Sequence, residues 1–523
     1  MAHPGGEAVA AHPVTHEPAG LGRREVRMVF SGLMLAMLLA ALDQTIVATA
    51  LPTITGDLGG LNHLSWVVTA YLLATTVVMP LYGKVGDVLG RKPAFQFAIV
   101  VFLIGSAASG WAHSMAELIA FRTLQGIGGG GLMIGAQAII GDIVSPRERG
   151  RYIGLLGGVY GLASVVGPLA GGFLVDQLSW RWIFFVNLPV GVVALVVTAV
   201  ALRQPATRIR SSIDYLGATL IAAAVTCLVL VTSLGGTTYP WSSAVIVGLA
   251  VGSVALGAAW LIAERHAAEP IVPLRLFRDP VFSVAGAISF VIGFSMLGAI
   301  SFLPTFLQIV TGVTATGSGL LMLSLMGGLL VAAIGSGQLI TRTGRYKLFP
   351  IAGTASAAAG LLLLSTMDAH TTRTAAAMYM VVFGVGIGLV MQVIVLAVQN
   401  SVPRGDLGVA TSSVSFLRQI GSTVGVASFG ALLTHRLSSQ LAGGVPSQAL
   451  SALGADLESI TPQAVNHLPP EAAQHIVQAF ANALPPIFGY LVPLVAVAFV
   501  LALMLKEKPL RTTAYLAAGR PQP

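Results

Sequence analysis

The chain has 523 residues, of which 55% are hydrophobic and only 9% are charged. Soluble domains carry about 25% charged residues, so this composition excludes an ordinary soluble protein and indicates a polytopic membrane protein. The net charge of +8 would suit a nucleic-acid partner, but the placement of the basic residues along the chain argues against one.

Apolar runs long enough to cross a bilayer, which takes roughly 20 residues, follow one another along the chain. Fourteen such runs predict an all-α protein with fourteen transmembrane helices. In chain order they lie near 28–51, 64–83, 93–112, 115–140, 152–175, 182–202, 213–233, 244–263, 281–304, 315–340, 348–366, 374–399, 409–434 and 485–505.

The loops between these runs alternate in charge. If the N-terminus is cytoplasmic, most Lys and Arg residues fall in cytoplasmic segments, and the outside loops hold only Arg181, Arg373 and Arg436. This asymmetry is the positive-inside rule. It predicts that both termini are cytoplasmic, namely a disordered tail over 1–24 and a basic C-tail over 506–523. It also accounts for the net positive charge by membrane topology, so no nucleic-acid partner is expected.

The sequence also contains a weak internal repeat at a nearly constant offset. Four segments recur in order: 51–54 as 303–306, 83–92 as 337–347, 122–133 as 380–391, and 145–150 as 402–408. The repeat predicts two six-helix bundles of the same orientation, 25–203 and 281–505, with an inserted transmembrane hairpin over 213–263. Parallel six-helix halves are a transporter design in which the substrate path lies between the halves.

Asp43, in the stretch ALDQTIVATALP, is the one acidic residue placed well inside a predicted span. A charge at the centre of a membrane helix costs about 2.5–3.5 kcal/mol, so it indicates function by default. Arg122 in the fourth span lies at a similar depth and is the expected partner. The pair predicts a proton-coupling site; the alternative is a static ion pair that fixes helix packing.

Two glycine-containing motifs predict close helix contacts. GKVGDVLGRK at 83–92 is predicted to form a short cytoplasmic loop in which Asp87 and Arg91 pair across an interface or cap a neighbouring helix. Its alternative role is simply that of a basic loop. The fifth span contains small residues that let helices approach and a proline that allows bending. This predicted hinge comprises Gly154, Gly167, Pro168, Gly171 and Gly172.

Arg418, in the thirteenth span, has no acidic neighbour in sequence. It is expected to bind an anionic group, to balance Asp43 or to extend toward the membrane surface, and the sequence does not choose among these. Further candidates for the substrate cavity are polar or soft side chains that would serve equally well in helix packing: Gln308, Gln392, Gln399, Met322, Met326, Met391, Phe294 and Phe416.

An outer segment over 435–484 separates the last two spans. Its part 471–484 predicts an amphipathic helix, either a lid at the outer mouth or an excursion on the membrane surface. The single cysteine, Cys227, permits neither a disulfide framework nor a cysteine metal site. GIGGGG at 126–131 lies inside a span without GK[ST], so no ATP site is expected.

Together these residues resemble the major facilitator superfamily, specifically its fourteen-span drug:proton antiporters of the QacA and EmrB type. LDQTIVATALP at 42–52 looks like that subfamily's first-span motif, and 83–92 matches the superfamily's loop motif through Gly83, Asp87, Gly90, Arg91 and Lys92. LIAFRTLQGIGGG at 118–130 and VGPLAGG at 166–172 resemble its fourth- and fifth-span motifs, although Ala163 stands where the latter has Gly. RWIFFVNLPVG at 181–191 and FLRQIGSTVG at 416–425 are also typical of the subfamily.

The resemblance implies a proton-driven multidrug exporter, not an enzyme, which works by alternating access without a cofactor and draws its energy from the proton gradient. Asp43 and Arg122 would be its proton-coupling residues. The later spans lack the additional membrane carboxylates of some polyspecific members, which favours neutral, zwitterionic, monocationic or anionic cargo over dications. The expected setting is a bacterial cytoplasmic membrane, with a monomeric protein and small amphipathic substrates. The alternative on the same fold is an exporter of lipids or endogenous metabolites.

Overall fold

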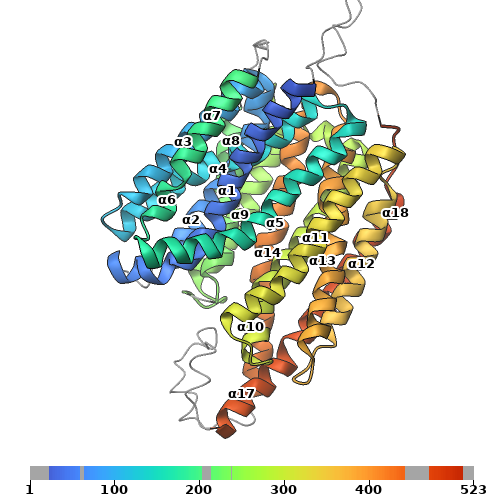
Figure 1. Ribbon diagram of the computed structural model, residues 1–523. Coiled ribbons are helices and arrows are strands. Elements are labelled where there is room, and N and C mark those ends of the chain that lie inside the picture. Colours follow the sequence, from blue (N-terminus) through green and yellow to red (C-terminus); the bar gives the residue numbers. More distant parts are fainter. Residues whose placement is uncertain (1–22, 59–63, 203–213, 237, 442–469, 511–523) are drawn as a thin grey trace, which may run out of the picture.

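The computed structural model describes residues 23–58, 64–202, 214–236, 238–441 and 470–510, and these residues form helices joined by short turns (Figure 1). The helices are α1 (Arg23–Leu58), α2 (Leu64–Leu89), α3 (Arg91–Gly110), α4 (Met115–Ile143), α5 (Pro146–Gln177), α6 (Trp182–Phe185), α7 (Asn187–Ala201), α8 (Tyr215–Leu234), α9 (Ala244–His266), α10 (Pro280–Ile309), α11 (Ala315–Thr343), α12 (Leu348–Ser365), α13 (Arg373–Ser401), α14 (Leu407–Leu441), α17 (Pro470–Ala483) and α18 (Pro485–Met504). No β-strand forms within these ranges.

Fourteen helical segments of the described chain are long and apolar enough to cross a membrane, which confirms the predicted all-α class and span count. The sixth span is shared by α6 and α7, which together run from Trp182 to Ala201. Several helices begin at a side chain that accepts a backbone N–H, as Ser114 does at α4 and Thr314 does at α11. Such caps satisfy donors that the helix itself leaves free, and they fix where these spans start.

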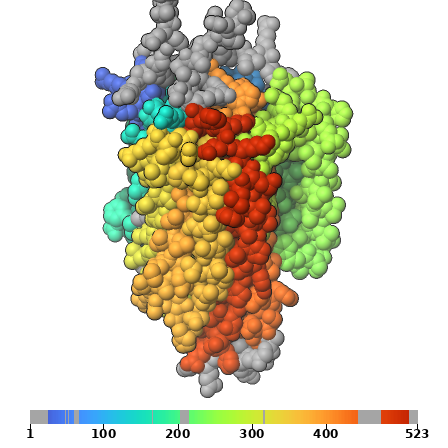
Figure 2. Space-filling view, turned by 90° about the vertical axis from the view of Figure 1, so that its right-hand side faces the viewer, coloured from blue at the N-terminus to red at the C-terminus, as the bar shows by residue number. Residues whose placement is uncertain are grey.

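Two bundles make up the body of the molecule, α1–α7 and α10–α18, and each has its own apolar core. They meet along two seams, where α5 packs along α11 and α2 packs along α14. The inserted hairpin of α8 and α9 stands outside both bundles, at one edge of the molecule (Figure 2). There α8 contacts α2 and α14, while α9 packs on α8 and is otherwise largely uncovered.

We call the end of the molecule where α2 meets α3, α4 meets α5 and α11 meets α12 the basic end, because Arg91, Arg147 and Arg345 lie there. The start of α1 and the end of α18 lie at this end, the upper one in Figure 1, and α17 lies at the opposite end. The sequence repeat is therefore reflected in two bundles that share one orientation.

Several helices extend beyond the predicted spans, as α1 does to Leu58, and two of the differences bear on the site. The loop predicted over 83–92 is wrong: α2 continues to Leu89 and α3 begins at Arg91, so only Gly90 breaks the helix, with φ 99°. A residue with a side chain adopts this φ only with strain, whereas glycine adopts it readily. The thirteenth span is longer than predicted, because α14 continues to Leu441. The helix predicted over 471–484 is present as α17, while 442–469, like most of the tail at 1–24, lies outside the described residues.

Candidate functional site

Asp43 lies on α1 in the interior of the N-terminal bundle and is 0% exposed. Its Oδ2 accepts a hydrogen bond of 2.5 Å from Nη1 of Arg122, which is itself 1% exposed. Its Oδ1 accepts from Nε2 of Gln125 at 2.8 Å and from Nδ2 of Asn187 at 3.2 Å. The carboxylate is thus held by one cation and two amides from α4 and α7, which is the surrounding that a buried ionised acid requires.

The guanidinium of Arg122 is held from several sides as well. It donates to the side-chain oxygen of Gln125 at 2.8 Å and to the Val67 carbonyl at 3.3 Å, and its Cζ lies 4.2 Å from the centre of the Tyr71 ring. Arg122 therefore joins α1, α2 and α4. The pairing expected from the similar depths of Asp43 and Arg122 is present in the structure.

Sequence reasoning missed the two amides. Gln125 lies one helical turn after Arg122 on α4, so its spacing placed it on the same helix face. Asn187 is the sole amide in the apolar run at 182–191, and it also donates to Ser106 Oγ at 3.0 Å. A polar side chain within an apolar span was the available signal for both residues.

A second charged cluster closes the seam between the bundles at the basic end. Asp87 on α2 accepts hydrogen bonds from the backbone N–H groups of Gly408 at 3.2 Å and Val409 at 2.9 Å, and so caps the start of α14. Arg91 pairs with Asp87 and with Asp142, the latter at 3.0 Å. A carboxylate at a helix N-terminus is favourable, so this cluster ties the N-terminal bundle to the C-terminal one.

The remaining residues of the 83–92 motif have distinct positions. A Cβ added to Gly83 would collide with Ser412 and approach the Gly408 carbonyl, so the glycine allows α2 to touch α14. Lys92 donates to the Ala199 carbonyl at 2.6 Å and joins α3 to α7 within one bundle. Gly83 therefore serves the seam and Lys92 does not.

The five predicted hinge residues of α5 separate into contact and non-contact positions. A Cβ at Gly154 would lie 2.7 Å from the Ala333 carbonyl of α11, and a Cβ at Gly167 or Gly171 would collide with threonines of α1. Gly172 has nothing within 4 Å, and Pro168 is exposed in an unbroken helix. Three of the five positions therefore hold α5 close to its neighbours.

The predicted cavity residues do not form one cluster. Gln308 bridges α10 to Ser318 of α11 at 3.0 Å. Gln399 of α13 donates to the Gln137 carbonyl of α4, in the other bundle, at 3.2 Å. Phe416 is buried against the inserted hairpin. Gln392 is buried against α5, and its Oε1 has no hydrogen-bond partner among the described residues, whereas Arg418 is half-buried. The partly buried candidates that pack at the edge of the C-terminal core are Phe294, Met322, Met326 and Met391.

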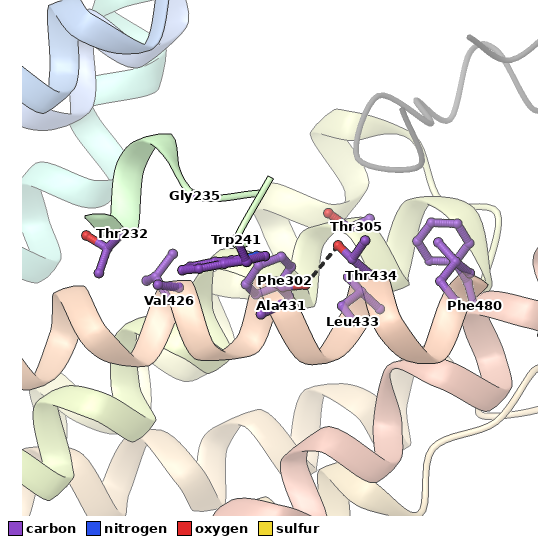
Figure 3. Close-up of a pocket in the computed structure, with 13 residues that line it drawn as sticks. Thr232, Gly235, Trp241, Phe302, Thr305, Val426, Ala431, Leu433, Thr434 and Phe480 are labelled. Carbon is purple, nitrogen blue, oxygen red and sulfur yellow. Dashed lines mark hydrogen bonds between the residues drawn. The ribbon is translucent and has the colours of Figure 1, made fainter. Parts of the chain in front are cut away.

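A cavity of about 310 Å³ lies where the inserted hairpin meets the C-terminal bundle, in the half of the spans nearer the opposite end. Trp241 lies beside Phe302 and Val426 along α14, and Thr305 and Thr434 point into the same space (Figure 3). Its lining includes no charged side chain. This volume lies at the lower limit of small-molecule pockets.

The segment 267–278, which connects α9 to α10, crosses the seam at the basic end. Its Glu269 pairs with Lys84 of α2 at 2.6 Å, and its Arg275 pairs with Asp406 of the C-terminal half at 2.8 Å. These residues line a second cavity of about 420 Å³. The connection from the hairpin thus contacts both halves beside Asp87.

Residues 33–426 match the family model described as Major Facilitator Superfamily. The chain is 47% identical over 485 residues to an uncharacterised MFS-type transporter of Mycobacterium tuberculosis, covering 92% of this chain and 70% of the relative. It is 39% identical over 472 residues to the multidrug transporter protein MdtP of Bacillus subtilis, covering 88% and 87% of the two chains. It is 34% identical over 496 residues to multidrug resistance protein 3 of the same organism, covering 93% and 96%.

Solved structures share the fold at low sequence identity. The human organic anion transporter MFSD10 superposes with a TM-score of 0.63 at 15% identity, covering 92% of this chain and all of that one. The proton:xylose symporter XylE also gives 0.63, at 14% identity, covering 95% and 99%. The family match across most of the chain, the two bundles and the fourteen spans lead to one conclusion: the chain belongs to the major facilitator superfamily and is a membrane transporter, not an enzyme.

Proposed function

We propose that this protein exports small amphipathic molecules in exchange for protons, with its basic end in the cytoplasm and Asp43 as the group that carries the proton. The observation that carries the proposal is the buried Asp43 carboxylate, held by Arg122, Gln125 and Asn187. An ionisable residue at this depth raises the free energy of the folded protein in the membrane, and such residues mark ion or proton paths. The multidrug transporters among its relatives support export as the direction of transport.

The cluster also explains why protonation would matter mechanically. A proton on Asp43 removes the negative charge that Arg122 and the two amides compensate, so their hydrogen bonds weaken. Thr45, two residues further along α1, donates to the Ala163 carbonyl of α5 at 3.0 Å. Because α5 also packs along α11 of the other bundle, a change at Asp43 can reach the α5–α11 contact between the halves through Thr45 and α5.

The charged contacts at the basic end hold the transporter in one of the two states of its cycle, the state closed to the cytoplasm. With Asp87 capping α14 and Arg91 pairing with Asp87 and Asp142, the cytoplasmic side is closed. Cargo enters from the cytoplasm only after these contacts separate, and rigid movement of one bundle against the other is the usual motion of such repeats. Proton loading of Asp43 from outside then favours the return to the inward-facing state.

The energy available matches this task. A membrane potential supplies about 2.3 kcal/mol per charge per 100 mV, so one proton supports a concentration ratio of about fiftyfold.

The test is energised uptake into inverted membrane vesicles, using a panel of cationic, neutral and anionic fluorescent dyes. We expect Asp43→Asn to abolish uptake that depends on the proton gradient. Asp57→Asn is the matched control, because Asp57 lies on the same helix but is exposed and pairs with Arg181 at 3.2 Å. Gradient-dependent uptake that persists in Asp43→Asn would falsify the proposal.

A further inference from the structure

Arg418 is a cation within a membrane span, and it has no acidic partner in the part of the chain that the structure describes. It lies eleven residues after the start of α14, which corresponds to about 16 Å along the helix axis and therefore to the middle of a bilayer. Among the described residues, no hydrogen bond or ion pair joins its side chain to another group. Its side chain is half-buried.

An unpaired cation at this depth suits an anionic ligand, which would compensate its charge. A positive charge at mid-membrane is unfavourable and is retained where it contacts a partner or a substrate path. Substrate sites in transporters with parallel repeats lie near the midplane, between the two halves. Arg418 has this depth, whereas Arg122 is already neutralised by Asp43.

The side chains around Arg418 come from both halves. Tyr160 of α5 lies within electrostatic range of the Arg418 guanidinium, and its side chain forms no hydrogen bond among the described residues. One turn away on α5, Gly157 faces Gln392 of α13, since a Cβ there would lie 3.0 Å from Gln392 Nε2. A phenol of the N-terminal half thus lies near the guanidinium, and an amide of the C-terminal half packs against α5 one turn from that phenol.

We propose that Arg418 binds the anionic group of the cargo, so that the exported molecules are amphipathic organic acids with a carboxylate or a comparable group. This inference rests on the proposed export function and specifies its substrate class. A carboxylate accepts two parallel N–H bonds from a guanidinium, and Tyr160 can donate a third. The apolar body of the cargo would pack against Phe294 and the partly buried methionines at the edge of the C-terminal core.

Binding to the purified full chain in detergent tests this inference without any gradient. The probes are matched pairs of fluorescent amphipathic carboxylates and their methyl esters, beginning with dansylglycine and its methyl ester. We expect the acids to bind more tightly than the esters, and Arg418→Gln to weaken the acids by about tenfold to a hundredfold while leaving the esters unchanged. This range corresponds to a charge-assisted hydrogen bond. Arg418→Lys should restore part of the preference.

Two further variants test whether the acid preference arises at Arg418 and not at the hairpin cavity or at the proton site. Trp241→Ala alters the uncharged cavity beside the hairpin, so the acid preference should survive it. Asp43→Asn should abolish gradient-driven uptake yet retain the acid preference in binding, which distinguishes failure of the proton site from failure of the anion site.

Equal binding of acids and esters by the unmodified protein overturns the assignment of Arg418, as does an acid preference that survives Arg418→Gln. The same holds if folded protein binds the cationic or neutral dyes but none of the acids. Thermal unfolding of each variant establishes that it is folded.

Discussion

Asp43 in the N-terminal half and Arg418 in the C-terminal half are both ionisable residues within membrane spans, yet their surroundings differ. Asp43 is fully buried and hydrogen-bonded to one cation and two amides. Arg418 is half-buried without such partners among the described residues. This difference motivates the two proposals above, in which the fully hydrogen-bonded Asp43 carries the proton and Arg418 binds a ligand.

The largest expected effect comes from leaving Asp43 without its ion-pair partner, as Arg418 is in the described part of the chain. Arg122→Gln leaves Asp43 buried without its cation, which should destabilise the fold by about 3–5 kcal/mol. Arg418→Gln removes an unpaired charge and should leave the stability unchanged or higher. Unfolding of both variants in SDS titrations measures this difference in stability. Equal losses of stability in the two variants would contradict the contrast between Asp43 and Arg418.

The next effect concerns the close contact between α1 and α5 at Gly167. Gly167→Ala places a methyl group against Thr45, and overpacking of this kind costs about 1–3 kcal/mol. Gly172→Ala is the matched control, because a Cβ there meets nothing within 4 Å. We expect lower thermal stability and slower export in the first variant and neither change in the second. Similar behaviour of both variants would show that tight contact at Gly167 is unimportant.

A smaller effect is expected from the amides around Asp43. Asn187→Leu removes one donor from the carboxylate and should cost about 1–2 kcal/mol. Because this donor holds the Asp43 carboxylate on the α7 side, gradient-driven uptake into inverted vesicles should slow, but by less than in Asp43→Asn. Undiminished uptake by folded Asn187→Leu would separate the amide from proton coupling.

The smallest effect is expected in the segment 267–278. Glu269→Gln removes a pair with Lys84 in which Glu269 remains 44% exposed, and such pairs contribute about 0–1 kcal/mol. Asp87→Asn at the nearby seam should open the basic end more strongly, since it weakens the cap of α14. Thiol labelling of Ser412→Cys in a Cys227→Ser background reports how far the basic end opens in each of the two variants. Greater labelling in Glu269→Gln than in Asp87→Asn would contradict the expected order.

Much of the architecture could be predicted from the sequence, because length and hydropathy determine what crosses a membrane. Asp43 and Arg122 were identifiable for the same reason: a charge in an apolar run is rare. Gln125 and Asn187 were missed because neutral amides are common in helix contacts. The loop predicted over 83–92 was wrong because its glycines suggested a turn, whereas the contact between Gly83 and Ser412 depends on α14, which is distant in sequence.

The identity of the proton-binding group is tested most directly by proton release from the purified protein in weakly buffered detergent solution. Binding of cargo and binding of a proton oppose each other in an antiporter, and this coupling is reciprocal. Adding the tightest-binding compound of the acid and ester panel should release protons from the unmodified protein and from Asp57→Asn. Asp43→Asn should bind the compound and release none. Undiminished proton release from Asp43→Asn would contradict the assignment of Asp43.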